Sequence, residues 1–196
     1  MTLLPAFRPG FLNLWIYMLL FITPMLITVS IRKHVFRKTT AVFRKSRNRR
    51  DINYFILTKN IMLLLFIVSI FIPLQVHSIF VWIGTGIFLT GYIFYLLSWI
   101  SILKNKDGNL MQRGLYKISR HPVYMSSLLI FTGAGIASTS YVIFGLSLLV
   151  GISNLSNAFK EEEICLEVFG NEYKEYSSKT PRWFGLKDIF SNWHVL

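Results

Sequence analysis

Two polar clusters in this chain have the residue types needed to bind a charged ligand beside a membrane. The first is residues 113–124, Arg-Gly-Leu-Tyr-Lys-Ile-Ser-Arg-His-Pro-Val-Tyr, and the second is the acidic run 161–163. About 36 residues separate them, almost all apolar, and this length suffices to cross a bilayer core of roughly 30 Å and return. The sequence therefore predicts that Glu161 and Glu162 meet Arg120 and His121 at one membrane face.

The cationic cluster leads into a predicted helix that starts at Pro122. Proline lacks an N–H, but first-turn donors of a helix have no intrahelical partner, so proline is well placed there. Taken singly, each feature has a simpler interpretation. Arg120 could be one more charge on the positive side of a membrane protein, and the glutamates could form a solvated helix face. The two clusters together favour a polar site next to lipid.

The composition is that of an integral membrane protein of one domain. Of the 196 residues, 53% are hydrophobic and 16% are aromatic, which is too apolar for a soluble domain of this length. The net charge of +12 raises the possibility of a nucleic-acid partner. However, nine Lys or Arg residues lie between Arg32 and Arg50, flanked by apolar runs, and this pattern indicates a cytoplasmic loop rather than nucleic-acid binding. The one cysteine, Cys165, can form neither an internal disulfide nor a metal-binding cluster, so no metal is expected.

Five apolar stretches are predicted to be transmembrane helices. They cover approximately residues 11–31, 54–74, 79–103, 122–138 and 141–159. A basic cytoplasmic loop then gives a multi-pass topology with the N-terminus outside and with the site and the C-terminus in the cytoplasm. The single membrane domain, residues 1–196, is expected to have three parts. These are three N-terminal spans with the basic loop 32–51 (1–103), a connector with the helical hairpin and the site (104–184), and an aromatic tail (185–196).

Glycines mark expected helix contacts and helix ends. Small residues in the third span should allow another helix to approach closely, and these residues are Gly84, Gly86 and Gly91. A helix that follows the fifth span, over residues 160–169, is predicted to end at Gly170, a natural position for a left-handed cap. A further short helix over residues 172–178 should place Tyr173 and Tyr176 on one face.

The ordered polar residues resemble a known enzyme superfamily. The matching positions are Gly114, Tyr116, Arg120, His121, Pro122 and Tyr124, then Glu161 and Glu162, then Phe169, Gly170, Tyr173, Tyr176, Pro181 and Arg182. They are similar to the isoprenylcysteine carboxyl methyltransferase and phospholipid methyltransferase superfamily, whose shared pattern is Arg-His-Pro, a variable hairpin and then Glu-Glu. The resemblance covers approximately residues 107–184, about 40% of the chain. It implies that this part holds S-adenosylmethionine, while the more variable N-terminal spans shape the acceptor site.

The resemblance also implies roles for individual residues. Glu161 or Glu162 would accept hydrogen bonds from the ammonium or ribose of S-adenosylmethionine, and Arg120 or the helix start would hold its carboxylate. The aromatic side chains of Tyr116, Tyr124 and Tyr173 would face its adenine or sulfonium. The expected cofactor-binding residues are Gly114, Tyr116, Arg120, His121, Pro122, Tyr124, Glu161, Glu162 and Tyr173. Arg120, His121 and Glu162 are the predicted catalytic residues, and His121 is expected to hold the cofactor rather than to act as a base.

These features favour an integral membrane methyltransferase that uses S-adenosylmethionine, forms S-adenosylhomocysteine and takes a lipophilic acceptor from the bilayer. The family-level prediction for the acceptor is the carboxylate of a prenylcysteine, which is already ionised at neutral pH and needs no strong base. The alternatives are an ethanolamine phospholipid, a hydrophobic thiol or an isoprenoid, for which His121 or a glutamate could take the proton. Interpretations of another class are an NADPH-dependent reductase of the sterol type and a non-catalytic membrane scaffold. The chain is short for such a reductase, and the intact polar set argues against a scaffold.

Overall fold

The fold is all-helical, as the sequence predicts. The computed structural model describes residues 1–3, 7–31, 49–105 and 109–184. Its helices are α1 (Trp15–Ile31), α3 (Arg49–Ser69), α4 (Ile79–Lys104), the short 3₁₀ helix η1 (Gly114–Lys117), α5 (Pro122–Ala137), α6 (Tyr141–Phe169) and α7 (Asn171–Lys179). Within the described ranges, β-structure is limited to two isolated bridges. Most of the predicted basic loop 32–51 and all of the predicted tail 185–196 lie outside the described residues.

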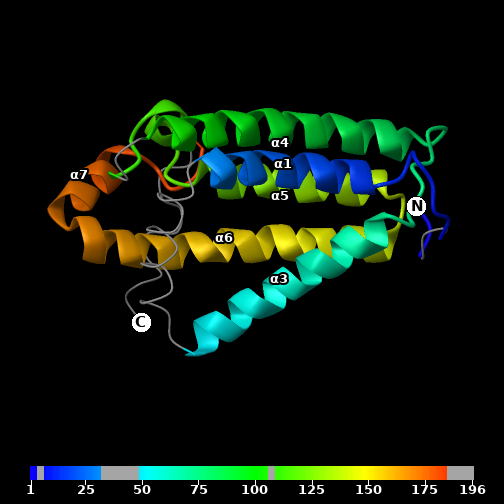
Figure 1. Cartoon of the computed structure of the whole chain (residues 1–196), viewed down its shortest axis with the longest axis horizontal. Helices are drawn as coiled ribbons and strands as arrows, with labels where there is room; N and C mark the ends of the chain where they lie inside the picture. The colour runs from blue at the N-terminus through cyan, green and yellow to red at the C-terminus, as the bar shows by residue number, and fades with distance from the viewer. Residues whose placement is uncertain (4–6, 32–48, 106–108, 185–196) are drawn as a thin grey trace.

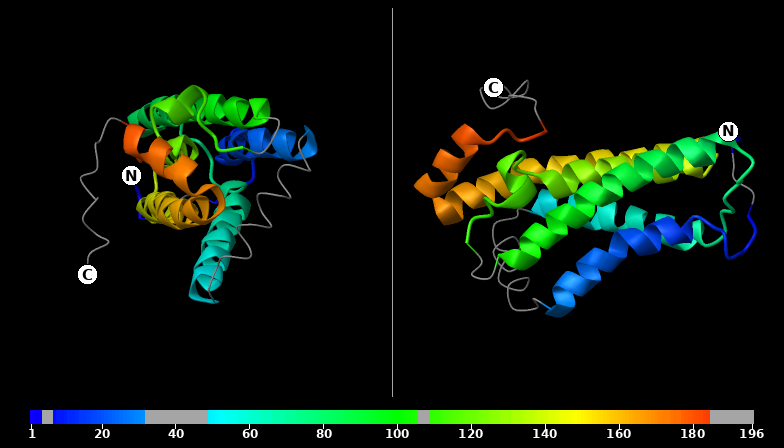
Figure 2. Two further views of the ribbon diagram at one scale, coloured as in Figure 1. Left: turned by 90° about the vertical axis from the view of Figure 1, so that its left-hand side faces the viewer. Right: turned by 90° about the horizontal axis from the view of Figure 1, so that it is seen from above.

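The long helices form an elongated bundle (Figure 1). α5 packs against both α4 and α6, while α1 contacts α4, and α3 contacts α6 and α1. In the end-on view of Figure 2, α3 projects away from the other helices. α7 lies at one end of the bundle, and the N-terminal residues lie at the other (Figure 1).

Two helices are long and apolar enough to cross a membrane, namely α4 with 26 residues and α6 with 29 residues. α1, α5 and the Ile56–Ser69 part of α3 are shorter apolar helices. Large apolar side chains on the outside of the bundle are exposed, among them Leu63, Trp82, Ile93 and Ile152. Soluble proteins rarely expose so much apolar surface. The structure thus supports two of the five predicted spans, whereas the other three and the topology remain predictions.

Residues 160–169 are helical and the helix ends at Gly170, as predicted, but these residues continue α6 without a break instead of forming a helix of their own. No glycine or proline lies between residues 152 and 169, so nothing in the sequence interrupts the backbone hydrogen bonds. The apolar part of α6 ends before Lys160, and the whole helix is about 44 Å long at 1.5 Å per residue. It is therefore longer than the roughly 30 Å that a helix needs to cross a hydrocarbon core.

α4 and α5 approach each other closely at two glycines of α4. A methyl group added at Gly84 would lie 2.4 Å from the backbone nitrogen of Ala137, and one added at Gly91 would lie 2.7 Å from the Cβ of Leu129. The predicted close contact is confirmed at Gly84 and Gly91. It is wrong at Gly86, where an added methyl group meets nothing within 4 Å. This packing fixes α5, whose first residue follows the cationic cluster.

Gly170 ends α6 and turns the chain into α7. Its φ of +52° has the predicted sign, and residues with a Cβ rarely adopt such values. Its ψ of −119° lies outside the left-handed helical region, so the predicted left-handed cap is wrong in its backbone conformation. α7 buries Tyr173 and Tyr176 on one face, as predicted. The Tyr176 hydroxyl donates to the carbonyl oxygen of Tyr116 at 2.6 Å, so α7 packs back onto the connector that precedes α5.

Candidate active site

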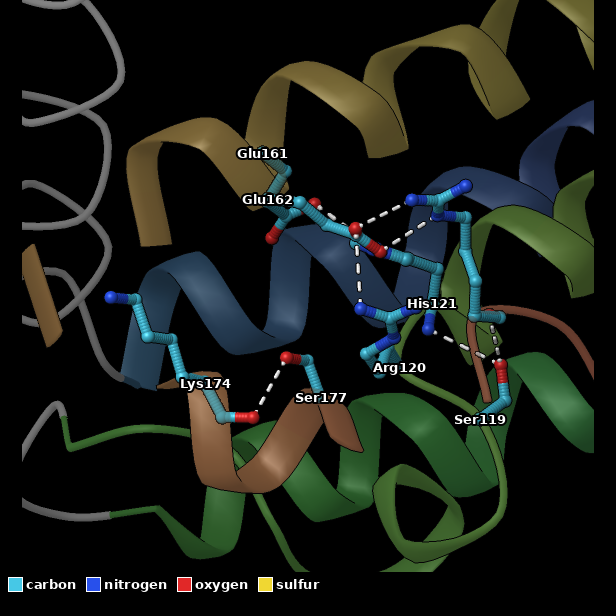
Figure 3. A network of polar contacts seen from close by, with 8 residues as sticks. Ser119, Arg120, His121, Glu161, Glu162, Lys174 and Ser177 are labelled. Carbon is cyan, nitrogen blue, oxygen red and sulfur yellow. Dashed lines mark hydrogen bonds and ion pairs between the residues drawn. The ribbon is translucent and has the colours of Figure 1, made fainter. Parts of the chain in front are cut away.

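The candidate site lies where three segments of the chain meet at the α7 end of the bundle. The connector supplies Arg120 and His121 just before α5, and the last turns of α6 supply Glu161 and Glu162 (Figure 3). The third segment follows α7 and supplies Arg182. The structure therefore brings together the two polar clusters that the sequence predicts to meet, and it adds a third cation.

Residues 180–184, here called the C-terminal strap, are tied to the connector by two hydrogen bonds. The backbone N–H of Arg120 donates to the carbonyl oxygen of Pro181 at 3.0 Å. The buried Ser119 hydroxyl donates to the carbonyl oxygen of Arg182 at 2.9 Å. These bonds hold the strap beside the connector and so place the Arg182 side chain against α6.

Glu162 is the common partner of the three cations. His121 Nε2 lies 3.0 Å from Glu162 Oε1. Arg182 donates from Nε to Oε1 at 2.9 Å and from Nη2 to Oε2 at 2.8 Å, and Arg120 Nη1 lies 3.3 Å from Oε2. The Glu162 side chain is only 10% exposed. A buried charge is costly unless it is paired and hydrogen-bonded, and this network meets both conditions.

Burial and neighbouring charges act in opposite directions on Glu162 and His121. Burial alone would raise the pKa of Glu162, but the hydrogen bonds from His121 and Arg182 and the charge of Arg120 lower this pKa to about 2. Burial alone would lower the pKa of His121, but its contacts with Glu161 and Glu162 raise this pKa above its usual value. Glu162 is therefore ionised at neutral pH, and the protonated form of His121 is favoured.

The His121 ring is held on several sides. Its Nε2 faces Glu162, and its Nδ1 lies 3.7 Å from an oxygen of Glu161. The ring stacks on Tyr124 at 5.7 Å between centroids and lies 6.0 Å from the Trp183 ring. A ring between two carboxylates is suited to donating hydrogen bonds rather than to removing a proton.

Glu161 differs from its neighbour Glu162 in exposure and in contacts. Its side chain is 30% exposed, because adjacent helix residues point in directions about 100° apart. Its 3.7 Å ion pair with His121 is longer than a hydrogen bond. Glu161 therefore retains acceptor capacity that a ligand can use.

The predicted aromatic and glycine residues are not equally close to the ion pairs. Tyr173 is buried, and its hydroxyl has no hydrogen-bond partner of good geometry among the described residues. Burial and the charge of Glu162 raise the pKa of Tyr173, and the nearby Arg120 opposes the rise. Gly114 instead has a φ of +60° and packs against Ser101 of α4. The structure thus gives Gly114 a role in the turn of the connector, and its contact with the cofactor stays a prediction.

α5 begins at Pro122, as predicted. In the described part of the chain, no side chain caps this helix start, which directly follows Arg120 and His121. An uncapped helix start beside an arginine favours binding of a carboxylate or another anion.

Arg182 and Trp183 were not among the predicted catalytic or cofactor-binding residues. In the structure, Arg182 makes the two-point contact with Glu162, and its guanidinium carbon lies 4.5 Å from the centroid of the Phe159 ring. Trp183 lies 6.2 Å from the same ring. Charge balance was the available signal, because a buried glutamate such as Glu162 needs cations beside it. Arg182 also belongs to the matching pattern.

An open depression of about 330 Å³ lies beside α7, and Glu162 and its three cationic partners do not line it. Its lining residues are Gln112, Lys117, Glu172, Glu175, Tyr176, Lys179 and Thr180. It contains none of the predicted site residues, and Lys179 pairs with Glu175 at 2.6 Å. This polar surface does not suit a lipophilic ligand.

The described residues bring together no set of three His, Cys, Asp or Glu side chains that could hold a metal ion. Cys165 lies close to the glutamates on α6. Burial, which is the larger cause, and the charge of Glu161 together raise the pKa of the Cys165 thiol to about 12. Such a thiol stays protonated at neutral pH and is a poor nucleophile.

Comparisons with known proteins place these residues in a wider context. A family profile described as phospholipid methyltransferase matches residues 57–172, more than half of the chain. The matching region extends from α3 into α7 and includes both the connector and the glutamates, but it ends before the C-terminal strap. A search of curated proteins found no match.

Proposed function

We propose that this chain, which belongs to the phospholipid methyltransferase family, transfers a methyl group from S-adenosylmethionine to a lipophilic acceptor in a membrane. Membership of the family indicates a membrane methyltransferase. The observation that carries the finer proposal is the ion cluster of Arg120, His121, Glu162 and Arg182, together with the more exposed Glu161. This cluster lies at the end of apolar helices, where a charged cofactor and a lipid can meet.

The residues of the site suit the charged groups of S-adenosylmethionine. When bound, the cofactor supplies a methyl group on a cationic sulfur. In this proposal Arg120 and the start of α5 bind a carboxylate, and Glu161 accepts hydrogen bonds from an ammonium. The buried Tyr173 hydroxyl, which lacks a partner of good geometry in the described part of the chain, supports a ligand at this position. The aromatic residues proposed to face the cofactor are Tyr116, Tyr124 and Tyr173.

A carboxylate acceptor fits the electrostatics of the site. His121 lies between two carboxylates that favour its protonated form, so it is poorly suited to remove a proton from an acceptor. A carboxylate is already ionised at neutral pH and needs no base. Alignment of the reactants and exclusion of water then remain the main tasks of the protein. The proposed acceptor is therefore the carboxylate of a prenylcysteine.

An ethanolamine phospholipid is the second candidate acceptor, and the description of the family favours it. Its amine must lose a proton before or during methyl transfer. Glu161 is the residue placed to accept that proton, because it is more exposed than Glu162 and makes only the long contact with His121.

The proposed topology follows from the distribution of charge. The site and the described N-terminal residues lie at opposite ends of the bundle (Figure 1). The basic segment between α1 and α3 favours the cytoplasmic side. We therefore place the site in the cytoplasm and the N-terminus outside, within a single membrane domain.

The test is transfer of a labelled methyl group by the purified full-length chain in mixed detergent and lipid micelles. S-adenosylmethionine labelled in its methyl group is supplied with N-acetyl-S-farnesylcysteine, phosphatidylethanolamine or a long-chain thiol. We expect label on the farnesylcysteine, in an ester that releases methanol in alkali. Alkali-stable label on the phospholipid would replace the carboxylate with the amine as acceptor. Absence of transfer to all three compounds by a folded protein would contradict the proposal.

A further inference from the structure

We propose that the neighbouring residues Glu161 and Glu162 have different tasks. Arg182 is the positioning residue that holds Glu162 in its structural task and so leaves ligand contact to Glu161. In this account Glu162 anchors Arg120 and His121 inside the protein, and Glu161 is the carboxylate that contacts the ligand. The inference rests on the proposed function, because it takes the ligand to be the cationic end of S-adenosylmethionine.

The first argument is that Glu162 is already saturated. A carboxylate offers about four acceptor positions. Glu162 uses them for His121 Nε2, for Nε and Nη2 of Arg182, and for Arg120 Nη1, at 3.0, 2.9, 2.8 and 3.3 Å respectively. A ligand ammonium could reach Glu162 only by displacing a buried cation. Glu162 is therefore poorly placed to contact a ligand directly.

The second argument is that Glu161 has the exposure that Glu162 lacks. The Glu161 side chain is 30% exposed, against 10% for Glu162. His121 Nδ1 lies 3.7 Å from Glu161, so this contact orients the imidazole without occupying the carboxylate as a hydrogen bond would. Glu161 is thus the acid that can accept hydrogen bonds from a ligand while the Glu162 network stays intact.

The third argument is that Arg182 is fixed from both its backbone and its side chain. Its carbonyl oxygen accepts a hydrogen bond from Ser119, and its guanidinium lies over the Phe159 ring at 4.5 Å. A guanidinium held in this way presents a planar pair of donors that matches a carboxylate. Arg120 contacts Glu162 less closely, at 3.3 Å. Arg182 therefore neutralises Glu162, so that Arg120 can shift toward a ligand carboxylate.

Three consecutive glutamates provide an internal test of the two tasks. The variants are Glu161→Gln, Glu162→Gln and Glu163→Gln, and Glu163 is the control because it is 53% exposed and pairs with Lys160 at the surface. Each full-length variant is purified in detergent, its melting temperature is measured, and its binding of S-adenosylhomocysteine is measured by calorimetry.

We expect Glu161→Gln to melt like the wild type but to bind S-adenosylhomocysteine at least tenfold more weakly. Glu162→Gln should melt at a lower temperature, and Glu163→Gln should change neither property. Wild-type affinity in Glu161→Gln would overturn the assignment of Glu161 as the contacting acid.

The role of Arg182 is tested with Arg182→Gln and Arg182→Lys, and Lys179→Gln serves as the control. Lys179 lies just before the strap and forms an exposed ion pair with Glu175, so its loss removes a cation without disturbing the buried network. We expect Arg182→Gln to weaken S-adenosylhomocysteine binding at least tenfold and Arg182→Lys to weaken it less. Lysine restores the charge but not the two-point geometry.

The pH dependence of S-adenosylhomocysteine binding distinguishes a positioning role of Arg182 from a purely structural role. Glu162 has Arg120 and His121 beside it on the connector, Arg182 on the strap, and Tyr173 and Tyr176 on α7. Glu161 and Cys165 lie near it on α6. Loss of Arg182 lets Glu162 take up a proton at a higher pH.

The acid limb of the S-adenosylhomocysteine binding curve should therefore move to higher pH in Arg182→Gln, less in Arg182→Lys, and not in Lys179→Gln. Weaker binding with an unchanged pH profile would overturn the positioning role. If the wild type itself does not bind, the proposed function fails. If the wild type binds and the Arg182 variants bind equally well, only the inference about Arg182 fails.

Discussion

Arg182 contacts Glu162 at two points, with Nε 2.9 Å from Oε1 and Nη2 2.8 Å from Oε2. The two residues belong to different parts of the fold, the C-terminal strap and the last turns of α6, and both side chains are 10% exposed. The contact joins the strap to the same carboxylate that His121 reaches from the connector. The Glu162 side chain thus connects the strap, the connector and α6, and its removal should affect folding as well as binding.

Replacement of Glu162 by glutamine should lower the free energy of unfolding by about 3 kcal/mol or more, because it leaves buried cations without their counter-ion. Chemical denaturation of the detergent-solubilised protein measures this change. The same substitution at the exposed Glu163 should alter the unfolding free energy by less than about 0.5 kcal/mol. Equal effects at the two positions would show that the buried network does not stabilise the fold.

Stability should decline at both ends of the pH range for different reasons. The pKa of Glu162 is lowered from 4.5 to about 2, so its stabilising effect is complete above about pH 4.5 and is lost as the pH falls toward 2. The pKa of His121 is raised from 6.5. Its stabilising effect is therefore complete below about pH 6.5 and is lost as the pH rises through the folded-state pKa.

Melting temperatures measured across this range should show a maximum between about pH 5 and pH 6.5. In His121→Gln, the melting temperature should fall less on the alkaline side than it does in the wild type. Its fall on the acid side should remain. An alkaline decline identical to that of the wild type would exclude His121 as its cause.

The contact between α4 and α5 predicts different outcomes for two glycines of one helix. Gly84→Ala should destabilise the protein by about 1–3 kcal/mol, because the new methyl group meets the backbone of Ala137 at 2.4 Å. Gly86→Ala adds a methyl group with nothing within 4 Å and should be neutral or stabilise the helix by up to about 1 kcal/mol. Unfolding measurements in detergent distinguish the two, and a stable Gly84→Ala variant would contradict the close helix contact.

The buried hydroxyl of Tyr173 predicts a variant that weakens binding without weakening the fold. Tyr173→Phe should retain or slightly raise stability, because the hydroxyl has no partner of good geometry within the described ranges. Its affinity for S-adenosylhomocysteine should fall by roughly 3- to 10-fold, the effect of one lost hydrogen bond. Tyr176→Phe provides the contrast, since its hydroxyl bonds Tyr116 and its loss should cost about 1 kcal/mol of stability. Unchanged affinity in Tyr173→Phe would remove this hydroxyl from the proposed pocket.

The sequence predicted the main features of the helical architecture from local signals. Apolar runs located the long helices, and the end of α6 followed from the glycine at position 170. The encounter of Arg120 and His121 with Glu162 followed from the length of the apolar hairpin between them. These features depend on neighbouring residues or on a single chain reversal, and they leave a visible pattern.

Features that depend on tertiary packing were less predictable. The contact of Gly84, but not of Gly86, with α5 depends on which side of α4 faces the neighbouring helix, and the nearly uniform apolar sequence of α4 does not reveal that side. The contact of Arg182 with Glu162 requires the strap to fold back after α7. One of the two hydrogen bonds that hold the strap joins two backbone groups, and the other joins the Ser119 hydroxyl to a backbone carbonyl oxygen. Every residue carries a backbone carbonyl, so the sequence does not show which residue either donor meets.

The most direct test of the account is calorimetric binding of S-adenosylhomocysteine to the wild-type protein in detergent, with NADPH measured in parallel. We predict saturable binding of S-adenosylhomocysteine at one site per chain and no binding of NADPH. Binding of NADPH alone would place the activity with the reductases. Failure of the folded protein to bind S-adenosylhomocysteine would contradict the proposed cofactor site.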